Sequence, residues 1–236
     1  MIYVILVAFV VFVLALQIID FNHTTYHAAT GNSFFATVLD KGRNGEYRIY
    51  KHLRQLEKHG AKFLFNVYLP KENGETTECD VILINHRGLI VFESKNYSGW
   101  IFGDEKSKTW MQTLPQGKGQ PAHKERFLNP IMQNKLHIKC LQACVGSNYA
   151  VQSIIAFSER CTLKKVTVND PNVQVVKRDE IQTAVTNATK RMPPNALTDA
   201  DIQRLYKRLY PYSQVNETVK QQHIQRIKEN QAKNKQ

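Results

Sequence analysis

Two charged residues stand at the end of the strand-like run "GLIVFESK". Glu93 and Lys95 are two residues apart, so on a β-strand their side chains project from the same face. A second strand-like run, "CDVILIN", comes just before, and the turn predicted at "NHRG" joins the two. This turn pairs Ile84 with Leu89. Counting outward along both strands then places Asp80 opposite Glu93 on one face of the sheet.

The chemistry of Asp80, Glu93 and Lys95 is that of a metal-dependent site. Two opposed carboxylates repel each other, especially near a core, unless a cation lies nearby. Oxygen ligands without a Cys or His pattern suit Mg²⁺ or Mn²⁺ rather than zinc. Lys95 would orient a water molecule or stabilise the charge that develops on a phosphate. These are the parts of a phosphodiester-cleaving site, and the simpler alternative is a salt bridge at a strand end.

A first flanking helix directs another carboxylate toward the core. The segment "GRNGEYRIYKHLRQLEKHG" has its apolar residues Ile49, Leu53 and Leu56 on one helical face, and Gly60 marks its end. Glu46 precedes Ile49 by three residues and therefore lies on the same inward stripe. The alternative for Glu46 is an acidic residue of the first turn, favoured by the helix dipole.

A second helix is predicted in "NPIMQNKLHIKCLQACVG", with Asn129 as its N-cap. Gln133 leads Leu136, His137 and Cys140 at helical spacing, so its amide is expected to face inward.

The order of elements predicts an α/β domain with a mixed sheet flanked by helices. Strands are predicted in "AKFLFNVYLP", "CDVILIN" and "GLIVFESK", and two more in "AVQSIIAFS" and "NVQVVK". Residues 97–127 form a Gly-rich and basic region to which no strand is assigned. Helices are expected near 179–189 and 198–210, and the polar segment 211–236 is expected to be a solvated or frayed helical tail.

Several of these motifs together resemble the NERD (nuclease-related) domain of the PD-(D/E)xK nuclease superfamily. The resemblance rests on "GRNGE", "ECDVILINHRGLIVFESKNYSG" and "NPIMQNKLHI", in that order, between about residues 41 and 141. It implies a restriction-endonuclease-like core, with the NERD domain placed at 41–210. Cys79 stands where the superfamily name has a proline.

The resemblance also implies roles for individual residues. Asp80 and Glu93 match the pair of metal ligands, and Lys95 matches the catalytic lysine. Glu46 resembles the acidic residue of the first helix, and Gln133 the glutamine that follows "NP". Together with the Ser94 backbone carbonyl, these residues would form a site for Mg²⁺ or Mn²⁺.

The N-terminus begins with nineteen apolar or uncharged residues, "MIYVILVAFVVFVLALQII", enough for one membrane-spanning helix. A cleaved signal peptide is the main alternative, although no basic residue precedes the apolar run. Basic residues follow only on its C-terminal side, so the positive-inside rule places the N-terminus outside and the nuclease-like domain in the cytoplasm. Residues 20–40 are interpreted as a linker.

The formal net charge of +12 favours an anionic partner, either nucleic acid or the cytoplasmic face of a membrane. Lys118, Lys124 and Arg126 lie in a basic segment that would either bind a phosphate backbone or form a solvated loop. Trp100 and Trp110 are expected to pack in the core or at its edge, with base stacking as the alternative. The four cysteines are expected to be buried thiols.

The sequence therefore predicts a membrane-anchored, Mg²⁺- or Mn²⁺-dependent nuclease that faces the cytoplasm, with DNA as the expected substrate. One alternative is a nuclease-like module that no longer cuts and serves as a tethered nucleic-acid-binding or scaffold protein. Another is a protein whose basic surface binds lipid.

Overall fold

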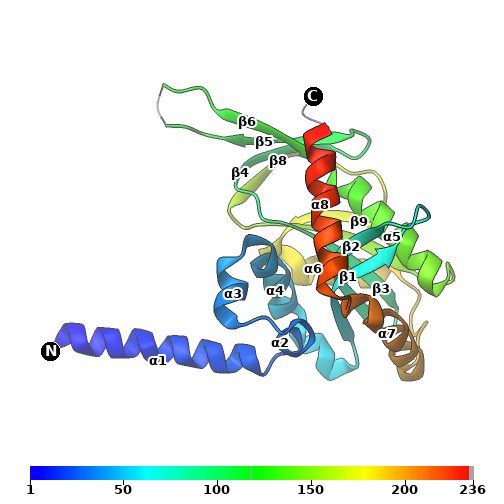
Figure 1. Cartoon of the computed structure of the whole chain (residues 1–236), viewed down its shortest axis with the longest axis horizontal. Coiled ribbons are helices and arrows are strands. Elements are labelled where there is room, and N and C mark those ends of the chain that lie inside the picture. Colours follow the sequence, from blue (N-terminus) through cyan, green and yellow to red (C-terminus); the bar gives the residue numbers. More distant parts are fainter. Residues whose placement is uncertain (118, 234–236) are drawn as a thin grey trace.

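The computed structural model describes residues 1–117 and 119–233 and has a mixed α/β architecture built on two sheets (Figure 1). The central sheet has five strands in the order β1-β2-β3-β7-β9. The strands of this sheet are β1 (Lys62–Pro70), β2 (Thr76–Asn85), β3 (Gly88–Lys95), β7 (Val151–Phe157) and β9 (Val173–Lys177). The first three strands are antiparallel, whereas β7 pairs in parallel with both β3 and β9. This is the mixed sheet that the sequence predicts.

Helices cover both faces of the central sheet. One face packs against α4 (Lys41–Leu53) and α6 (Ile181–Arg191), and the other packs against α5 (Pro130–Val145) and α7 (Asp199–Ser213). Alternate residues of β3 supply the two cores: Ile90 and Phe92 face α4, whereas Leu89 and Val91 face α5. A strand buried on both faces explains why the run "GLIVF" is uniformly apolar.

The helix boundaries follow the signals in the sequence. Asn129 caps α5 by accepting a hydrogen bond from the Ile131 N–H at 2.9 Å. After α4 the chain continues as the 3₁₀ helix η1 (Arg54–His59), which ends at Gly60 with φ of +82°. Leu136 of α5 is an exception, because its side chain is 41% exposed instead of facing the core as predicted. It lies one residue before buried His137, at the margin of the inward stripe.

A second sheet occupies the region to which the sequence assigns no strand. Its order is β6-β5-β4-β8, with β4 at Gly99–Asp104, β5 at Thr109–Leu114, β6 at His123–Leu128 and β8 at Cys161–Thr167. The absence of predicted strands in residues 97–127 was therefore wrong. Both β6 and β8 are largely exposed, so they lack the apolar runs by which buried strands are recognised.

The two tryptophans of this region differ in environment. Trp110 is 1% exposed and donates a hydrogen bond to the Asp104 carbonyl at 3.0 Å, as expected of a core residue. Trp100 is 41% exposed, with the Lys164 ammonium over its ring at 5.3 Å from the ring centroid, so of the two predicted positions, core or edge, the core is excluded for it. Cys79, Cys140 and Cys161 are buried and Cys144 is partly buried, and all four are free thiols.

The segment expected to be a linker is folded onto the core. After α1 (Ile2–Asn22) come two short helices, α2 (Thr25–Thr30) and α3 (Phe34–Leu39). Phe21 and Tyr26 are both fully buried, and their rings contact Tyr47 of α4. Residues 20–40 are therefore part of the domain, anchored by single aromatic residues rather than by a repeating apolar pattern.

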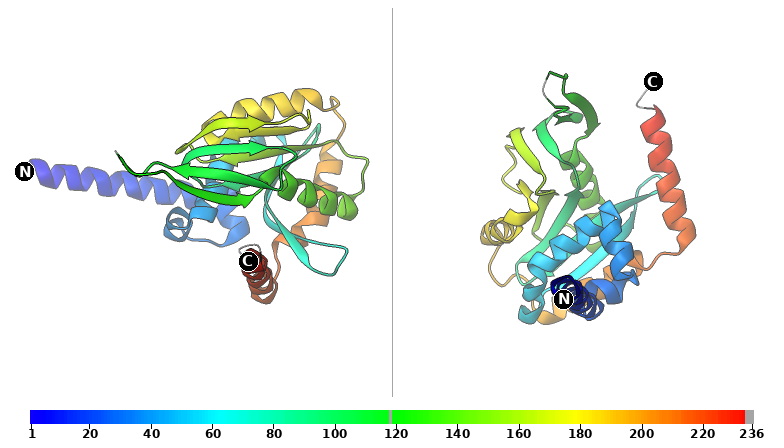
Figure 2. Two further views of the ribbon diagram at one scale, coloured as in Figure 1. Left: turned by 90° about the horizontal axis from the view of Figure 1, so that it is seen from above. Right: turned by 90° about the vertical axis from the view of Figure 1, so that its left-hand side faces the viewer.

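The two ends of the chain differ in how they meet the domain. Helix α1 projects away from the body (Figures 1 and 2), and it is long and apolar enough to be a candidate membrane-spanning helix. Of the predicted tail, residues 211–213 end α7, and Glu217–Lys233 form α8, which contacts β1 and β2. Residues 234–236 lie outside the described residues. His223 anchors α8 there, 9% exposed and edge-on to the Tyr68 ring at 5.5 Å between centroids.

We expect Asn129→Ala to lower the free energy of unfolding by about 2 kcal/mol. Besides capping α5, the buried Asn129 amide donates to the carbonyls of Asp104, Glu105 and Ser107, which tie α5 to the second sheet. Denaturant unfolding of the full chain in non-ionic detergent measures the loss. Asn129→Asp is the comparison: it keeps the capping oxygen but turns a carboxylate oxygen toward the three carbonyls, so it should also be less stable than the unaltered chain. A loss below about 0.5 kcal/mol for Asn129→Ala would contradict this account.

Candidate functional site

The candidate site lies where β2 and β3 separate. The β2–β3 ladder pairs Ile84 with Leu89, as predicted, and runs to Val81 and Phe92. Extending it by one residue on each strand places Asp80 opposite Glu93. Beyond this point the Ser94 N–H donates to the Asp80 carboxylate at 2.6 Å instead of to a backbone carbonyl. The backbone hydrogen bonds between β2 and β3 therefore end here, and the carboxyl groups of Asp80 and Glu93 lie at the point where they stop.

Glu93 is the most deeply buried of the predicted charged residues. It is 2% exposed, and each of its carboxylate oxygens has a cationic or hydrogen-bonding partner. Oε1 lies 2.6 Å from the Lys95 ammonium, and Oε2 lies 3.0 Å from Nε2 of His137. Burial alone would raise the pKa of Glu93, but Lys95 and then His137 hold this pKa below its usual value. Glu93 is thus an ionised carboxylate inside the core.

Lys95 joins Glu93 to the helix α5. Its ammonium also donates a hydrogen bond to Oε1 of Gln133 at 2.9 Å, so the predicted inward orientation of Gln133 is observed. Burial would lower the pKa of Lys95, but the charges of Glu93 and Asp80 outweigh it and raise this pKa. The ammonium is therefore held charged between a carboxylate and an amide oxygen.

Asp80, unlike Glu93, has no cationic side chain within ion-pair distance among the described residues. Its pKa is raised well above the usual value by burial and by the charges of Glu93 and Glu46, and the charge of Lys95 only partly offsets this. A carboxyl in this position holds a proton unless additional positive charge is supplied. The two neighbouring acids thus differ in protonation because only Glu93 has the lysine.

Glu46 approaches from the opposite face of the sheet. It is carried by α4, is 7% exposed, and accepts a hydrogen bond from the Tyr26 hydroxyl at 3.4 Å. Burial and the charge of Glu78 raise the pKa of Glu46 to about 8, although a hydrogen bond from Asn66 lowers it. The structure thus places Glu46 near Asp80 and Gln133 beside Lys95. Glu46 comes from α4 on one face of the sheet, and Gln133 comes from α5 on the other.

Asn66 explains how Glu46 comes near Asp80. It lies between the β1 residues paired with Val81 and Cys79, and so faces Asp80 across the ladder. Its φ is +51°, a left-handed conformation that Asn tolerates better than most residues, and the regular pairing is interrupted there. This distortion opens the sheet at the point where the carboxyls of Asp80 and Glu46 approach each other.

Three residues of this region were not assigned a role from the sequence: His137, Asn66 and Glu78. His137 is 2% exposed, and its Nδ1 lies 2.8 Å from the Thr77 hydroxyl, which leaves Nε2 directed at Glu93. The inward helical spacing of His137 was visible, but its partner was not. Glu78 lines a cavity of about 450 Å³ together with Glu46, beside α8.

The donor set fits a hard divalent ion in its chemistry. Asp80 and Glu93 supply carboxylate oxygens, the Ser94 backbone carbonyl is adjacent, and the raised pKa of Asp80 marks a place where positive charge is lacking. Within residues 1–117 and 119–233, no group of three or more His, Cys, Asp or Glu side chains is placed as a ready-made metal centre. A bound ion would therefore rest on two side-chain ligands plus backbone or water oxygens.

The residues predicted to contact nucleic acid lie on the second sheet. Lys124 and Arg126 are exposed on β6, an edge strand of the hairpin β5–β6 that projects from the body (Figure 1). Lys118 lies outside the described residues. The base of this hairpin is close to the site, because Phe127 contacts Tyr97, two residues after Lys95, with 4.5 Å between ring centroids.

Comparison with known proteins agrees with the motifs. A family model described as NERD, nuclease-related domain, matches residues 41–158. An uncharacterized protein from Bacillus anthracis is 30% identical over 184 residues, covering 78% of this chain and 82% of that protein. No solved structure matches significantly. The matched family segment contains Glu46, Asp80, Glu93, Lys95 and Gln133.

Proposed function

The chain belongs to the NERD (nuclease-related domain) family, and we propose that it is a metal-dependent nuclease acting on nucleic acid. One observation carries the proposal: the Lys95 ammonium is held between Glu93 and Gln133, beside an Asp80 carboxyl that would ionise only when additional positive charge is bound. A partly buried lysine and paired carboxylates at a strand end are groups suited to phosphodiester hydrolysis.

Asp80 and Glu93, with the Ser94 carbonyl, would hold Mg²⁺ or Mn²⁺. When bound, the ion would polarise a phosphate oxygen and lower the pKa of a coordinated water. Lys95 already has a second partner in Gln133, so its ammonium stays fixed when Glu93 Oε1 takes another ligand. We assign Lys95 to the orientation of water or the stabilisation of charge on the phosphate, and Glu46 and Gln133 to positioning.

DNA is the substrate we propose. The chain carries a formal net charge of +12, and Lys124 and Arg126 extend along an exposed edge strand whose base contacts Tyr97 near the site. Such side chains bind phosphates without reading sequence. This surface would hold the backbone of the substrate near Lys95.

We propose further that α1 anchors the domain to a membrane, with the N-terminus outside and the nuclease domain in the cytoplasm. Lys41, Arg43, Arg48 and Lys51 all follow the apolar helix, in agreement with the positive-inside rule. The closely packed α2 and α3 would then hold the domain near the membrane surface.

The contacts of Glu93 favour one alternative. Both of its oxygens are engaged, by Lys95 and by His137, as in a permanently closed ion-pair network. A protein in which this network never admits a metal would be a nuclease-like binding or scaffold module that does not cut.

A cleavage assay with the full chain in non-ionic detergent distinguishes the two functions. Single- and double-stranded DNA and RNA are incubated with Mg²⁺, with Mn²⁺, and with EDTA alone. We expect cleavage of DNA that requires Mg²⁺ or Mn²⁺ and stops in EDTA. Binding of DNA without cleavage under every metal condition would support the scaffold function and reject the nuclease.

A further inference from the structure

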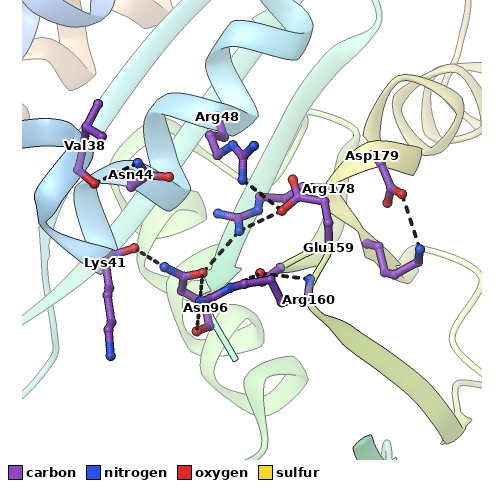
Figure 3. Close-up of polar contacts among 11 residues, drawn as sticks. Val38, Lys41, Asn44, Arg48, Asn96, Glu159, Arg160, Arg178 and Asp179 are labelled. Atoms are coloured by element: carbon purple, nitrogen blue, oxygen red, sulfur yellow. Dashed lines mark hydrogen bonds and ion pairs between the residues drawn. The ribbon is translucent and has the colours of Figure 1, made fainter. Parts of the chain in front are cut away.

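A small basic cavity lies at the end of β3, on the side covered by α4. Its volume is about 210 Å³, and Figure 3 shows its polar side chains grouped around Asn96, the residue that follows Lys95. We call it the Arg178 cavity. Its polar lining consists of Lys41, Asn44, Arg48, Asn96, Arg160 and Arg178.

Arg178 is a buried cation with unused hydrogen-bond donors. It is 1% exposed, and its Nη2 donates to Oδ1 of Asn96 and to Oε2 of Glu159, both at 3.2 Å. Its Nε and Nη1 are buried and have no hydrogen-bond partner among the described residues. Leaving buried donors unpaired costs free energy, so such groups call for an acceptor from outside the chain.

The lining of the cavity is strongly positive. One carboxylate oxygen, Oε2 of Glu159, is shared by Arg178 and by Nη1 of Arg48 at 3.1 Å. Among the described residues Arg160 has only neutral acceptors, chiefly Asn96, at 2.9 Å to its Oδ1 and 3.3 Å to its carbonyl. Lys41 is exposed and forms no ion pair within the described part of the chain. Arg48 and Arg178 thus share one carboxylate, and the other two cations of the lining, Lys41 and Arg160, have none among the described residues.

The chemistry and the size of the cavity both indicate a phosphate group. Guanidinium groups present paired donors that match the oxygens of phosphate, and an anion supplies the acceptors that Arg178 lacks. The volume is below the roughly 300 to 1,000 Å³ of pockets that enclose whole small molecules. The cavity therefore suits one phosphate rather than an entire nucleotide.

Its position connects it to the proposed active site. Asn96 is bonded to Lys95, and α4 carries both Glu46 and the Arg48 of the cavity. Gly45 lets α4 come this close, because a Cβ there would lie 2.3 Å from Oγ of Ser94 and 3.2 Å from Nη1 of Arg178. The cavity and the Glu93–Lys95 pair thus occupy opposite sides of the same strand end.

We propose that the Arg178 cavity binds a phosphate of the nucleic acid backbone next to the bond that is cleaved. This inference rests on the proposed nuclease function for the identity of the ligand. Phosphate contacts of this kind fix the register and orientation of a nucleic acid without reading its sequence. The site would place the scissile phosphate against Lys95.

The first test measures binding of inorganic phosphate to the full chain in non-ionic detergent with EDTA present. The phosphate-dependent rise in Tm gives the dissociation constant. We expect Arg160→Gln to weaken phosphate binding by about fivefold, since one charge-assisted contact is lost. Arg208→Gln, at an exposed arginine of α7, is the control and should bind phosphate as the unaltered chain does.

Arg178→Lys provides a second variant, because it keeps the positive charge but removes the donors Nε and Nη1. We expect it to weaken phosphate binding by at least about tenfold. Because Arg178 is buried, the Arg178→Lys variant can fail to fold. In that case the test rests on Arg160→Gln alone. Equal phosphate affinity in Arg160→Gln and Arg208→Gln, or no phosphate binding at all, would overturn the proposal.

The second test identifies the source of the phosphate. Binding of a single-stranded oligonucleotide is measured in EDTA at several salt concentrations, and we expect Arg160→Gln to reduce the salt slope by about 0.7. The assignment to nucleic acid would be overturned if Arg160→Gln left the salt slope of oligonucleotide binding unchanged but weakened the binding of a soluble short-chain phosphatidic acid. These binding tests do not depend on cleavage. If the protein bound phosphate through the cavity but did not cleave nucleic acid, the nuclease function would be rejected and the proposed phosphate site would stand.

Discussion

Lys95→Met is expected to reduce metal-dependent cleavage by about a hundredfold to a thousandfold, the loss typical when one group that stabilises transition-state charge is removed. Met fills a similar volume, and His137 still contacts Oε2 of Glu93, so the core retains one partner for that carboxylate. The rate of cleavage of double-stranded DNA, measured at saturating Mg²⁺ with the full chain in detergent, tests this. Mn²⁺ binding to the same variant should persist, because Lys95 is not a ligand.

Two comparisons make the Lys95 result interpretable. Lys190→Met removes an exposed lysine of α6 and should leave cleavage unchanged. Lys95→Arg keeps the charge and should retain more activity than Lys95→Met. If Lys95→Met cut DNA at the rate of the unaltered chain, Lys95 would be only a structural partner of Glu93, and the proposed mechanism would be rejected.

The register of the β2–β3 hairpin was predictable because one short turn determines it. Once the turn pairs Ile84 with Leu89, the two-residue periodicity of a strand leaves a single position for Asp80 relative to Glu93. The inward directions of Glu46 and Gln133 followed from helical periodicity in the same way. In each case the information lies within a few neighbouring residues, where local geometry is nearly rigid.

The contacts that complete the site were not predictable, since they join distant segments. The His137–Glu93 pair spans 44 residues, and it depends on how α5 crosses the sheet. Asn66 offers no signal in the sequence that it adopts a positive φ opposite Asp80. Arg178 follows an ordinary-looking strand, and only the close approach of α4, permitted by Gly45, makes it a buried cation.

The elements missed from the sequence share one physical property. The helices α2 and α3 are six residues each, too short for a helical period to show, and Phe21 and Tyr26 fix them as isolated aromatic anchors. The strands of the second sheet are mostly exposed on one side or at an edge. Hydrophobic periodicity identifies elements that bury a regular face, and these elements do not.

Glu46→Gln is expected to change how the stability of the protein depends on pH. The pKa of Glu46 is about 8 in the folded chain, against 4.5 for an unperturbed glutamate. Between these values the folded state holds a proton that the unfolded state has lost, so stability falls as pH rises, by about 1.4 kcal/mol per pH unit. The full cost, roughly 5 kcal/mol, is reached above pH 8 and is absent below about pH 4.5.

The amide introduced by Glu46→Gln would mimic the protonated carboxyl at every pH and still accept a hydrogen bond from Tyr26. This variant should therefore be within about 1 kcal/mol of the unaltered chain near pH 5 and should exceed its stability at pH 9 by roughly 5 kcal/mol. Denaturant unfolding of the full chain in detergent and EDTA at pH 5, 7 and 9 measures the difference. The charge of Glu46 is one cause of the raised pKa of Asp80, so Glu46→Gln also reduces the Asp80 contribution, which has the same sign and adds to the difference at high pH. Glu125→Gln, at an exposed position of β6, should show no such divergence. If the free energy of unfolding varied with pH in the same way for Glu46→Gln and the unaltered chain, Glu46 would be ionised in its buried position. The surroundings of Glu46 and Asp80 would then already contain enough positive charge without a metal.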